Sequence, residues 1–506
     1  MTLLWKQLRL LPWLSCAMTL ATPRKRVAII GAGAGGLVAA KVMREDLDVV
    51  VYEQHESVGG IWRRGGDVVY DGLRCNLPHQ TMAFKGFPFV ESETRGRSFV
   101  DTRAVTAYLE RFGADVDVRF GKKVASVRRR KKSSGSSGKQ WEIAFAANDE
   151  DPEVFDFVVV ANGHYEKAAT LGSSLYEESV RVSHSRDYQN PAKYAGKTVV
   201  LVGARSSGTD LAKELAFEGA AAKVVVADKN CRQYKTFFGQ KLAHAPPIVE
   251  VRKDKSVLFL DGTVEPAVDE IISCVGFDYA FPFLEGSGVI TTRGRVVEPL
   301  WNHLFLVDEQ DSTIAFLGLP HSVVPFPLMQ AQALAANAVF AGRATLPASE
   351  ERRLDFQKHK DALPRPKDAH HLGDAQWDYC KQLVRLAADD DDLATTTTTT
   401  NVDLVDGWDR FVDTNRAIYN HVGPRRPAIP GAPDVYRDLQ YEADHDAGSW
   451  RCLNEDTIDD RLRTLYIDAV RTTTKKNHDE GHQQQHELKQ EDAEECASST
   501  TTKKTG

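Results

Sequence analysis

Residues 27–36 read VAIIGAGAGG, and this stretch decides the fold. Its first four residues form a continuous apolar run, which is typical of a buried parallel strand. The pattern Gly-x-Gly-x-x-Gly then occupies Gly31, Gly33 and Gly36, and a helix is predicted over 37–44. Gly31 permits a tight turn, Gly33 lets the backbone approach a pyrophosphate, and Gly36 allows the helix to pack closely on the strand. The stretch therefore predicts the first turn of a dinucleotide-binding unit.

A second apolar run over 49–52 ends at Glu53, which lies 22 residues after Gly31. A carboxylate at this strand end can accept hydrogen bonds from both ribose hydroxyls of a nucleotide. The N–H groups at the start of the intervening helix attract the phosphates. This order of strand, glycine turn, helix, strand and acid predicts a Rossmann-type unit, and its N-terminal position with a Glu favours FAD. The alternative is a glycine-rich turn that holds no ligand.

The same order of elements returns later in the chain. A strand predicted over 197–202 leads into a second turn, a helix over 209–217 and a returning strand over 224–226. Arg205 takes the place of the second glycine, where it would either crowd the approach of a backbone or contact a phosphate itself. The turn runs from Gly203 through Arg205 to Gly208, and a nicotinamide dinucleotide is the expected ligand of this second unit.

Three charged residues after the returning strand bear on which nicotinamide cofactor is bound. The acid Asp228 would favour NADH by binding a ribose hydroxyl. Lys229 and Arg232 would favour NADPH by pairing with its 2′-phosphate. Two basic residues against one acidic residue favour NADPH over NADH. The sequence leaves open, by one residue, which of these positions lies at the ribose, and a shift would change this preference.

We expect an α/β protein with two Rossmann-like dinucleotide-binding domains, the nicotinamide domain being inserted in a discontinuous FAD domain. Buried strands over 155–160 and 270–272 are predicted to close the two units. The expected organisation is a targeting, anchoring or untranslated segment over 1–23, the first part of the FAD domain over 24–165, the NADPH domain over 166–280, the second part of the FAD domain with a helical C-terminal region over 281–471, a low-complexity insert over 388–400, and a disordered tail over 472–506.

The composition excludes several classes of protein. The 506 residues carry 64 Lys and Arg against 71 Asp and Glu, a net charge of −7, which argues against a strongly basic nucleic-acid binder. The seven cysteines form no Cys-x-x-Cys pair and no cluster, which argues against a disulfide scaffold, a metal site and a dithiol redox centre. We therefore expect neither a nucleic-acid partner nor a metal.

The first 21 residues are basic, apolar and free of acid. They could be a signal peptide, an organelle transit peptide or a helix lying on a membrane, or they could be untranslated if Met18 is the true start. No apolar run in the chain reaches the length of a bilayer-spanning helix, so membrane contact is expected only through this segment. A cytoplasmic location is the first expectation, with the endoplasmic reticulum or an organelle as the alternative.

Many short motifs, found in order along most of the chain, carry a resemblance to one family. From about Arg26 to beyond Gln376 the sequence resembles the flavin-containing monooxygenases, and it is most similar to the plant and algal branch that S-oxygenates thioethers. The motifs lie at 58–62, 69–82, 87–89, 161–165, 184–188, 206–210, 274–284, 317–320 and 325–327.

The resemblance implies roles for individual residues. Asn76 falls on the asparagine that faces the flavin and NADP⁺, and it is the expected catalytic residue because its amide can hydrogen-bond a peroxide without acting as a strong acid or base. The positions that bind nicotinamide dinucleotide are Gly203, Ser206, Ser207 and Gly208. The positions that bind FAD are Gly31, Gly33, Gly36, Glu53, Gly60, Trp62, Asn76 and Gln332.

The resemblance also implies a reaction. NADPH would reduce FAD, and a flavin 4a-hydroperoxide would insert one oxygen atom of O₂ into a thioether sulfur or an amine nitrogen of a small molecule. The family's identifying stretch F-x-G-x-x-x-H-x-x-x-Y/F is matched by His184 and Tyr188, whereas Glu178 and Val180 replace its Phe and Gly. The identifying stretch ends in a tyrosine, Tyr188, which favours this activity over that of a Baeyer–Villiger or decarboxylating monooxygenase acting on a carbonyl substrate. A flavin disulfide reductase and a degenerate, non-enzymatic redox sensor are the remaining alternatives.

Overall fold

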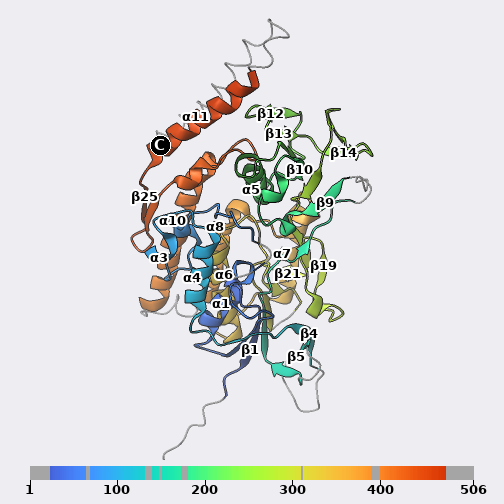
Figure 1. Cartoon of the computed structure of the whole chain (residues 1–506). Coiled ribbons are helices and arrows are strands. Elements are labelled where there is room, and N and C mark those ends of the chain that lie inside the picture. Colours follow the sequence, from blue (N-terminus) through green and yellow to red (C-terminus); the bar gives the residue numbers. More distant parts are fainter. Residues whose placement is uncertain are drawn as a thin grey trace, which may run out of the picture.

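The computed structural model describes residues 23–63, 66, 69–130, 140–146, 151–172, 180–308, 312–388 and 399–474. Nearly all of the predicted N-terminal segment and tail, most of the low-complexity insert, and Glu178 lie outside these residues. Within the described part of the chain, two mainly parallel sheets form the centre of the fold, one above the other in Figure 1.

The first sheet has seven strands in the order β21-β22-β23-β7-β1-β2-β3. The strands from β23 to β3 run parallel, and β22 and β21 add an antiparallel edge. The first strand of the chain is central, because β2 and β7 pair with its two sides. The bounds are β1 Arg26–Ile30, β2 Asp48–Tyr52, β3 Val118–Arg119, β7 Phe157–Val160, β21 Leu300–Trp301, β22 Phe305–Leu306 and β23 Ile314–Phe316.

Both faces of this sheet are covered, which explains the continuous apolar run of β1. Val27 and Ile29 face a cluster to which several helices contribute, whereas Ala28 and Ile30 face a cluster formed with a small antiparallel sheet. The helices include α1 Ala34–Met43, α4 Thr102–Gly113, α6 Pro325–Phe340 and α8 Gln376–Ala387. The small sheet consists of β4 Val124–Arg129, β5 Trp141–Phe145 and β6 Glu153–Phe155.

The buried strand predicted over 155–160 is confirmed for Phe157–Val160 (β7), whereas Phe155 belongs to β6 of a different sheet. β6 ends at Phe155 and β7 begins at Phe157. Between them, the carboxylate of Asp156 accepts a hydrogen bond from the backbone N–H of Arg26 at 2.8 Å. This polar residue interrupts the apolar run, and the chain changes layer there.

The second sheet has the order β12-β13-β11-β10-β17-β9, with only β12 antiparallel to its neighbour. β10 takes the central place that β1 has in the first sheet. The helix that follows begins three residues earlier than predicted, because α5 covers Ser206–Lys213 and continues as a π-helical turn over Glu214–Glu218. The strands are β9 Arg181–His184, β10 Thr198–Val202, β11 Lys223–Ala227, β12 Lys235–Phe237, β13 Leu242–Ala245 and β17 Glu270–Ser273.

The chain enters and leaves the second unit through one pair of short antiparallel strands, β8 (Lys167–Ala168) and β18 (Phe277–Asp278). On either side of this pair the chain belongs to the first unit, since β7 and β23 are neighbours in the first sheet. The predicted architecture, in which one dinucleotide-binding unit is inserted in another, is confirmed. The residue limits given above for the domains stay predictions.

The chain after β23 is mainly helical. α6 packs against α1 and α8, and α8 packs against α10 (Thr399–Val422). The sequence pattern did not predict the hairpin that follows, formed by β24 (Tyr441–Asp444) and β25 (Ser449–Cys452). The last helix of the described residues, α11 (Glu455–Thr474), includes the first three residues of the predicted tail and extends from the upper left of the molecule in Figure 1.

Candidate active site between two dinucleotide-binding units

The first glycine turn connects β1 to α1 at the carboxyl edge of the first sheet. Gly31 has a φ of +101°, a conformation that favours glycine. A Cβ atom on Gly36 would lie 1.8 Å from the carbonyl oxygen of Gly31, so only glycine lets α1 sit this close to the turn. Gly33 is the N-cap of α1, and the N–H groups of the first helical turn have no acceptor within the helix. This cradle is suited to a pyrophosphate.

A second loop closes the cradle. Gly60 has a φ of +60°, and a Cβ atom on it would lie 3.1 Å from the Cα of Gly33, so the two backbones touch. Trp62 ends the short 3₁₀-helix Gly60–Trp62 and packs, partly buried, against the core of the first unit. Its carbonyl oxygen accepts a hydrogen bond from the Thr106 hydroxyl, which fixes the loop on α4.

Glu53 lies just beyond β2 and is only 5% exposed. Its Oε2 accepts a hydrogen bond from the N–H of Ala32 at 2.8 Å, and its Oε1 accepts one from the N–H of His55 at 3.0 Å. A carboxylate has about four acceptor positions, so both oxygens keep capacity for ribose hydroxyls. The acid therefore fixes the glycine turn, and its contact with a ribose stays a prediction.

Both ends of the Gln332 amide are bonded to the protein. Its Oε1 accepts a hydrogen bond from the N–H of Gly318 at 2.9 Å, and its Nε2 donates to the hydroxyl of Tyr379 at 2.9 Å. The side chain is completely buried. Gln332 thus fixes the loop after β23, beside the first glycine turn, and its contact with the flavin stays a prediction.

The second glycine turn repeats the geometry of the first. Gly203 has a φ of +110°, and a Cβ atom on Gly208 would again lie 1.8 Å from the carbonyl oxygen of the first glycine. Arg205, the N-cap of α5, has φ −85° and ψ −171°, close to the −74° and −174° of Gly33. Because any residue can adopt this conformation, the backbone tolerates arginine, whose exposed side chain stands at the start of the helix. Ser206 and Ser207 are the first residues of α5.

The residues after β11 differ in how free they are to bind a nucleotide. The carboxylate of Asp228 accepts a hydrogen bond from the backbone N–H of Asn230 at 2.9 Å and so stabilises its own turn. Lys229 and Arg232 are exposed. Since Asp228 keeps acceptor positions just as Glu53 does, the preference for a 2′-phosphate rests on the two exposed cations and stays a prediction.

Replacing both Lys229 and Arg232 with Ala should raise the KM for NADPH by about tenfold or more, because each charge-assisted hydrogen bond contributes about 1.5–3 kcal/mol. The KM for NADH should change little. The measurement is NADPH and NADH oxidation by the double variant, with Lys253→Ala, an exposed lysine of the same unit, as the control. An equal effect on both cofactors would contradict the assignment.

Asn76 lies in a loop of the first unit that reaches the second. Its side-chain Nδ2 donates to the Ser206 hydroxyl at 3.4 Å, and its backbone carbonyl accepts a hydrogen bond from Arg426 at 3.3 Å. The asparagine amide therefore touches the start of the nicotinamide-side helix. Its neighbour Cys75 is a free thiol whose burial raises its pKa to about 12, which argues against a redox-active thiolate here.

The two matched residues of the family's identifying stretch are bonded within the second unit. His184 Nε2 contacts the carbonyl oxygen of Gly276 at 3.0 Å, and its Nδ1 accepts a hydrogen bond from the N–H of Arg186 at 3.0 Å. Burial lowers the pKa of His184. The Tyr188 hydroxyl donates to Glu214 at 2.6 Å. These contacts give both residues a structural role.

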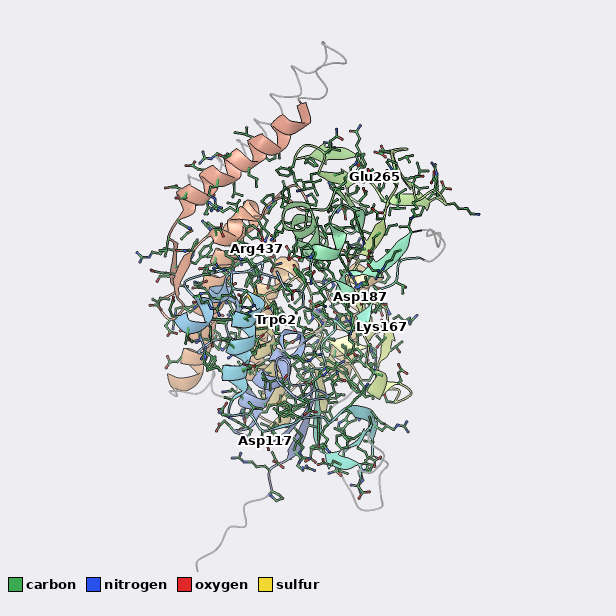
Figure 2. The ribbon with its side chains drawn as sticks, in the orientation of Figure 1. Trp62, Asp117, Lys167, Asp187, Glu265 and Arg437 are labelled. Carbon is green, nitrogen blue, oxygen red and sulfur yellow. The ribbon has the colours of Figure 1, made fainter. Side chains whose placement is uncertain are left out.

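Two arginines from the C-terminal part of the chain reach the site, and no sequence pattern predicted them. Arg426 contacts Asn76, as described above. Arg437 pairs with Asp210 of α5 at 2.6 Å, and Figure 2 labels it where the C-terminal segment meets the second unit. These contacts span 350 and 227 positions in the sequence, so no local motif could have revealed them.

The fold and the site define a protein with two dinucleotide-binding turns, and an asparagine amide of the first unit contacts the helix that begins at the second turn. Comparison with known proteins identifies its family. The family model described as flavin-binding monooxygenase-like matches residues 24–233 and 238–394. The chain belongs to this family.

Individual relatives agree with this assignment. The chain is 33% identical over 390 residues to the flavin-containing monooxygenase FMO GS-OX5 of Arabidopsis thaliana, covering 70% of this chain and 83% of the relative. The solved structure of S-allyl-L-cysteine S-oxygenase from Allium sativum has a TM-score of 0.68 and 28% identity, covering 88% of this chain and 98% of that one. Tmm from Pelagibacter sp. has the same fold, with a TM-score of 0.66, 21% identity, and coverage of 84% and 95%.

Membership makes the protein a flavin monooxygenase, and the family's cofactors are FAD and NADPH. This confirms the resemblance inferred from the sequence motifs. Among the described residues, no helix is both long and apolar enough to cross a membrane, and no group of three or more His, Cys, Asp or Glu side chains could hold a metal ion.

Proposed function

We propose that the protein uses NADPH and O₂ to insert one oxygen atom into a thioether sulfur or an amine nitrogen. The observation that carries the proposal is the 3.4 Å contact between Asn76 and Ser206, because it joins the flavin-side loop to the helix of the nicotinamide turn. The Allium sativum relative is named for a thioether substrate, S-allyl-L-cysteine. This likeness supports sulfur as the first choice.

The roles of this chain's residues follow from their places. FAD, when bound, supplies the activation of O₂, which amino-acid side chains do not provide. The turn at Gly31 and the start of α1 would hold its pyrophosphate, and Glu53 would orient its ribose. The start of α5 at Ser206 would hold the pyrophosphate of NADPH, with Lys229 and Arg232 at its 2′-phosphate.

Asn76 is the group proposed to act at the reacting oxygen. Its amide offers donors and an acceptor, and it has no proton that titrates near neutral pH. It can therefore orient a reacting oxygen by hydrogen bonding without protonating it. Such a neutral partner favours oxygen transfer to the substrate over loss of hydrogen peroxide.

The test uses the purified full chain with FAD, NADPH and a panel of one thioether, one tertiary amine and one cyclic ketone. A yellow protein whose NADPH oxidation increases with the thioether or amine, with formation of the sulfoxide or N-oxide, would support the proposal. Conversion of the ketone alone to a lactone would replace it with a Baeyer–Villiger activity. A protein that stays colourless after FAD addition would point to a non-enzymatic role.

A further inference from the structure

The segment between α10 and β24 crosses from the helices of the first unit to the second unit. We define residues 423–438 as the C-terminal strap. Ile429 and Ala432 belong to the buried apolar cluster of the second unit. Gly431 has a φ of +85°, and a Cβ atom on it would lie 2.5 Å from the Cβ of Ala212 in α5. The strap backbone therefore packs directly on the helix that begins at the nicotinamide turn.

The strap ends in a buried cation. Arg437 is 3% exposed and pairs with Asp210 of α5 at 2.6 Å and with Asp434 of the strap at 2.9 Å. Its Nε donates to the Tyr436 hydroxyl at 3.1 Å. Burial lowers the pKa of Arg437, but Asp210 and its other partners raise it above the usual range, so the guanidinium stays charged.

The same network includes the first unit. The Tyr70 hydroxyl donates to the second carboxylate oxygen of Asp210 at 3.2 Å. Arg74 donates to the backbone carbonyl of Arg437 at 2.7 Å and pairs with Asp438 at 3.4 Å. The loop that carries Tyr70 and Arg74 is also the loop that leads to Asn76. Helix α5, the strap and the Asn76 loop are thus joined through one buried ion pair.

The network lies close to the proposed reaction site. Asp210 stands one helical turn after Ser206, whose hydroxyl accepts the hydrogen bond from Asn76 at 3.4 Å. Another strap residue, Arg426, contacts the Asn76 carbonyl at 3.3 Å. Movement of the strap would therefore shift the start of α5 relative to the Asn76 amide. Removing one partner of a buried ion pair leaves the other charge unpaired, so the helix would have to adjust.

We propose that Arg437 is a positioning residue, which holds the nicotinamide-side helix against the Asn76 loop and thereby couples NADPH oxidation to oxygen transfer. This role rests on the proposed monooxygenase function. In coupled turnover, NADPH, a proton, O₂ and a thioether give NADP⁺, water and a sulfoxide. In uncoupled turnover, NADPH, a proton and O₂ give NADP⁺ and hydrogen peroxide. Both reactions use the two electrons of NADPH. The ratio of sulfoxide to hydrogen peroxide therefore depends on how the reacting groups are positioned and not on the supply of electrons.

The experiment compares the full-length wild type with Arg437→Gln, Arg437→Lys and Arg451→Gln. The last is the control, because Arg451 of β25 pairs with Glu442 of the same hairpin and its side chain is 70% exposed. The measurements are flavin content, KM for NADPH, kcat, and hydrogen peroxide and sulfoxide formed per NADPH oxidised.

Arg437→Gln should keep its flavin, because the ion pairs it loses are with Asp210 and Asp434 and lie outside the turn at Gly31. Its KM for NADPH should rise, and its coupled turnover should fall about tenfold or more, since small displacements of reacting groups have effects of this order. Arg437→Lys should recover part of the coupling, because an ammonium keeps the charge but cannot span both carboxylates as a guanidinium does. Arg451→Gln should match the wild type.

The outcomes separate the two claims. A wild type that makes no sulfoxide or N-oxide would overturn the proposed function. A coupled wild type together with an equally coupled Arg437→Gln would overturn only the positioning role. If Arg437→Gln does not fold, the Arg437→Lys variant tests the positioning role instead. Wild-type coupling together with a wild-type KM for NADPH in Arg437→Lys would overturn that role.

Discussion

Replacing Gly36 with Ala should yield a protein that purifies without flavin. The added Cβ would lie 1.8 Å from the Gly31 carbonyl oxygen, a distance that no packing tolerates. α1 would have to move off β1, and the N–H groups at its start would leave the pyrophosphate position. Overpacking of this kind typically costs about 1–3 kcal/mol, and here the cost falls on the FAD cradle. The measurement is the flavin absorbance per protein, with added FAD.

Gly208→Ala is the matched control for this prediction. Its Cβ would meet the Gly203 carbonyl oxygen at the same 1.8 Å, but in the second unit. This variant should stay yellow and lose NADPH oxidation, whereas Gly36→Ala should lose the flavin itself. Gly36→Ala with full flavin occupancy, or Gly208→Ala with a wild-type KM for NADPH, would contradict the assignment of the two turns.

Replacing Asn76 with Ala or Asp should give a yellow enzyme that oxidises NADPH and releases most of the electrons as hydrogen peroxide. Alanine removes the hydrogen-bonding group altogether. Ionised aspartate keeps the size of the side chain but only accepts hydrogen bonds, so it cannot replace the donor that contacts Ser206 at 3.4 Å. Losing one preorganised donor typically lowers turnover by about 10²–10³-fold. The measurement is sulfoxide and hydrogen peroxide formed per NADPH.

Gln357→Ala provides the control for Asn76, because it removes an exposed amide that bonds to Asp361 on α7 (Ser349–Ala362). It should leave coupling unchanged. Asn76 variants that form sulfoxide with wild-type coupling would show that the amide does not act on the reacting oxygen.

The local parts of both cradles could be predicted from the sequence, because each lies within a short continuous segment. Strand, turn and helix follow one another from Arg26 to Met43, and Gly31 and Gly36 meet because they are five residues apart. Both faces of β1 are buried, so the successive residues after Arg26 are all apolar, and this continuous apolar run marks the strand. The second turn was recognisable despite Arg205, because its backbone conformation does not require glycine.

The contacts between the units could not be predicted in this way. Arg437 and Asp210 are 227 positions apart, and nothing in either local sequence marks them as partners. The break at Asp156 was missed because the flanking residues are apolar on both sides, so one strand and two strands have nearly the same pattern. Sequence periodicity reports which face of an element is buried, and it does not report which distant element covers that face.

Isotopically labelled O₂ provides the most direct test of the central claim that this chain is an NADPH-dependent monooxygenase of soft nucleophiles. Wild-type enzyme would be incubated with NADPH, labelled O₂ and a thioether, and the product analysed by mass spectrometry. The expected result is a sulfoxide that carries one labelled oxygen atom, formed in step with NADPH oxidation. A sulfoxide without label, or NADPH oxidation that yields only hydrogen peroxide with every thioether and amine tried, would contradict the account.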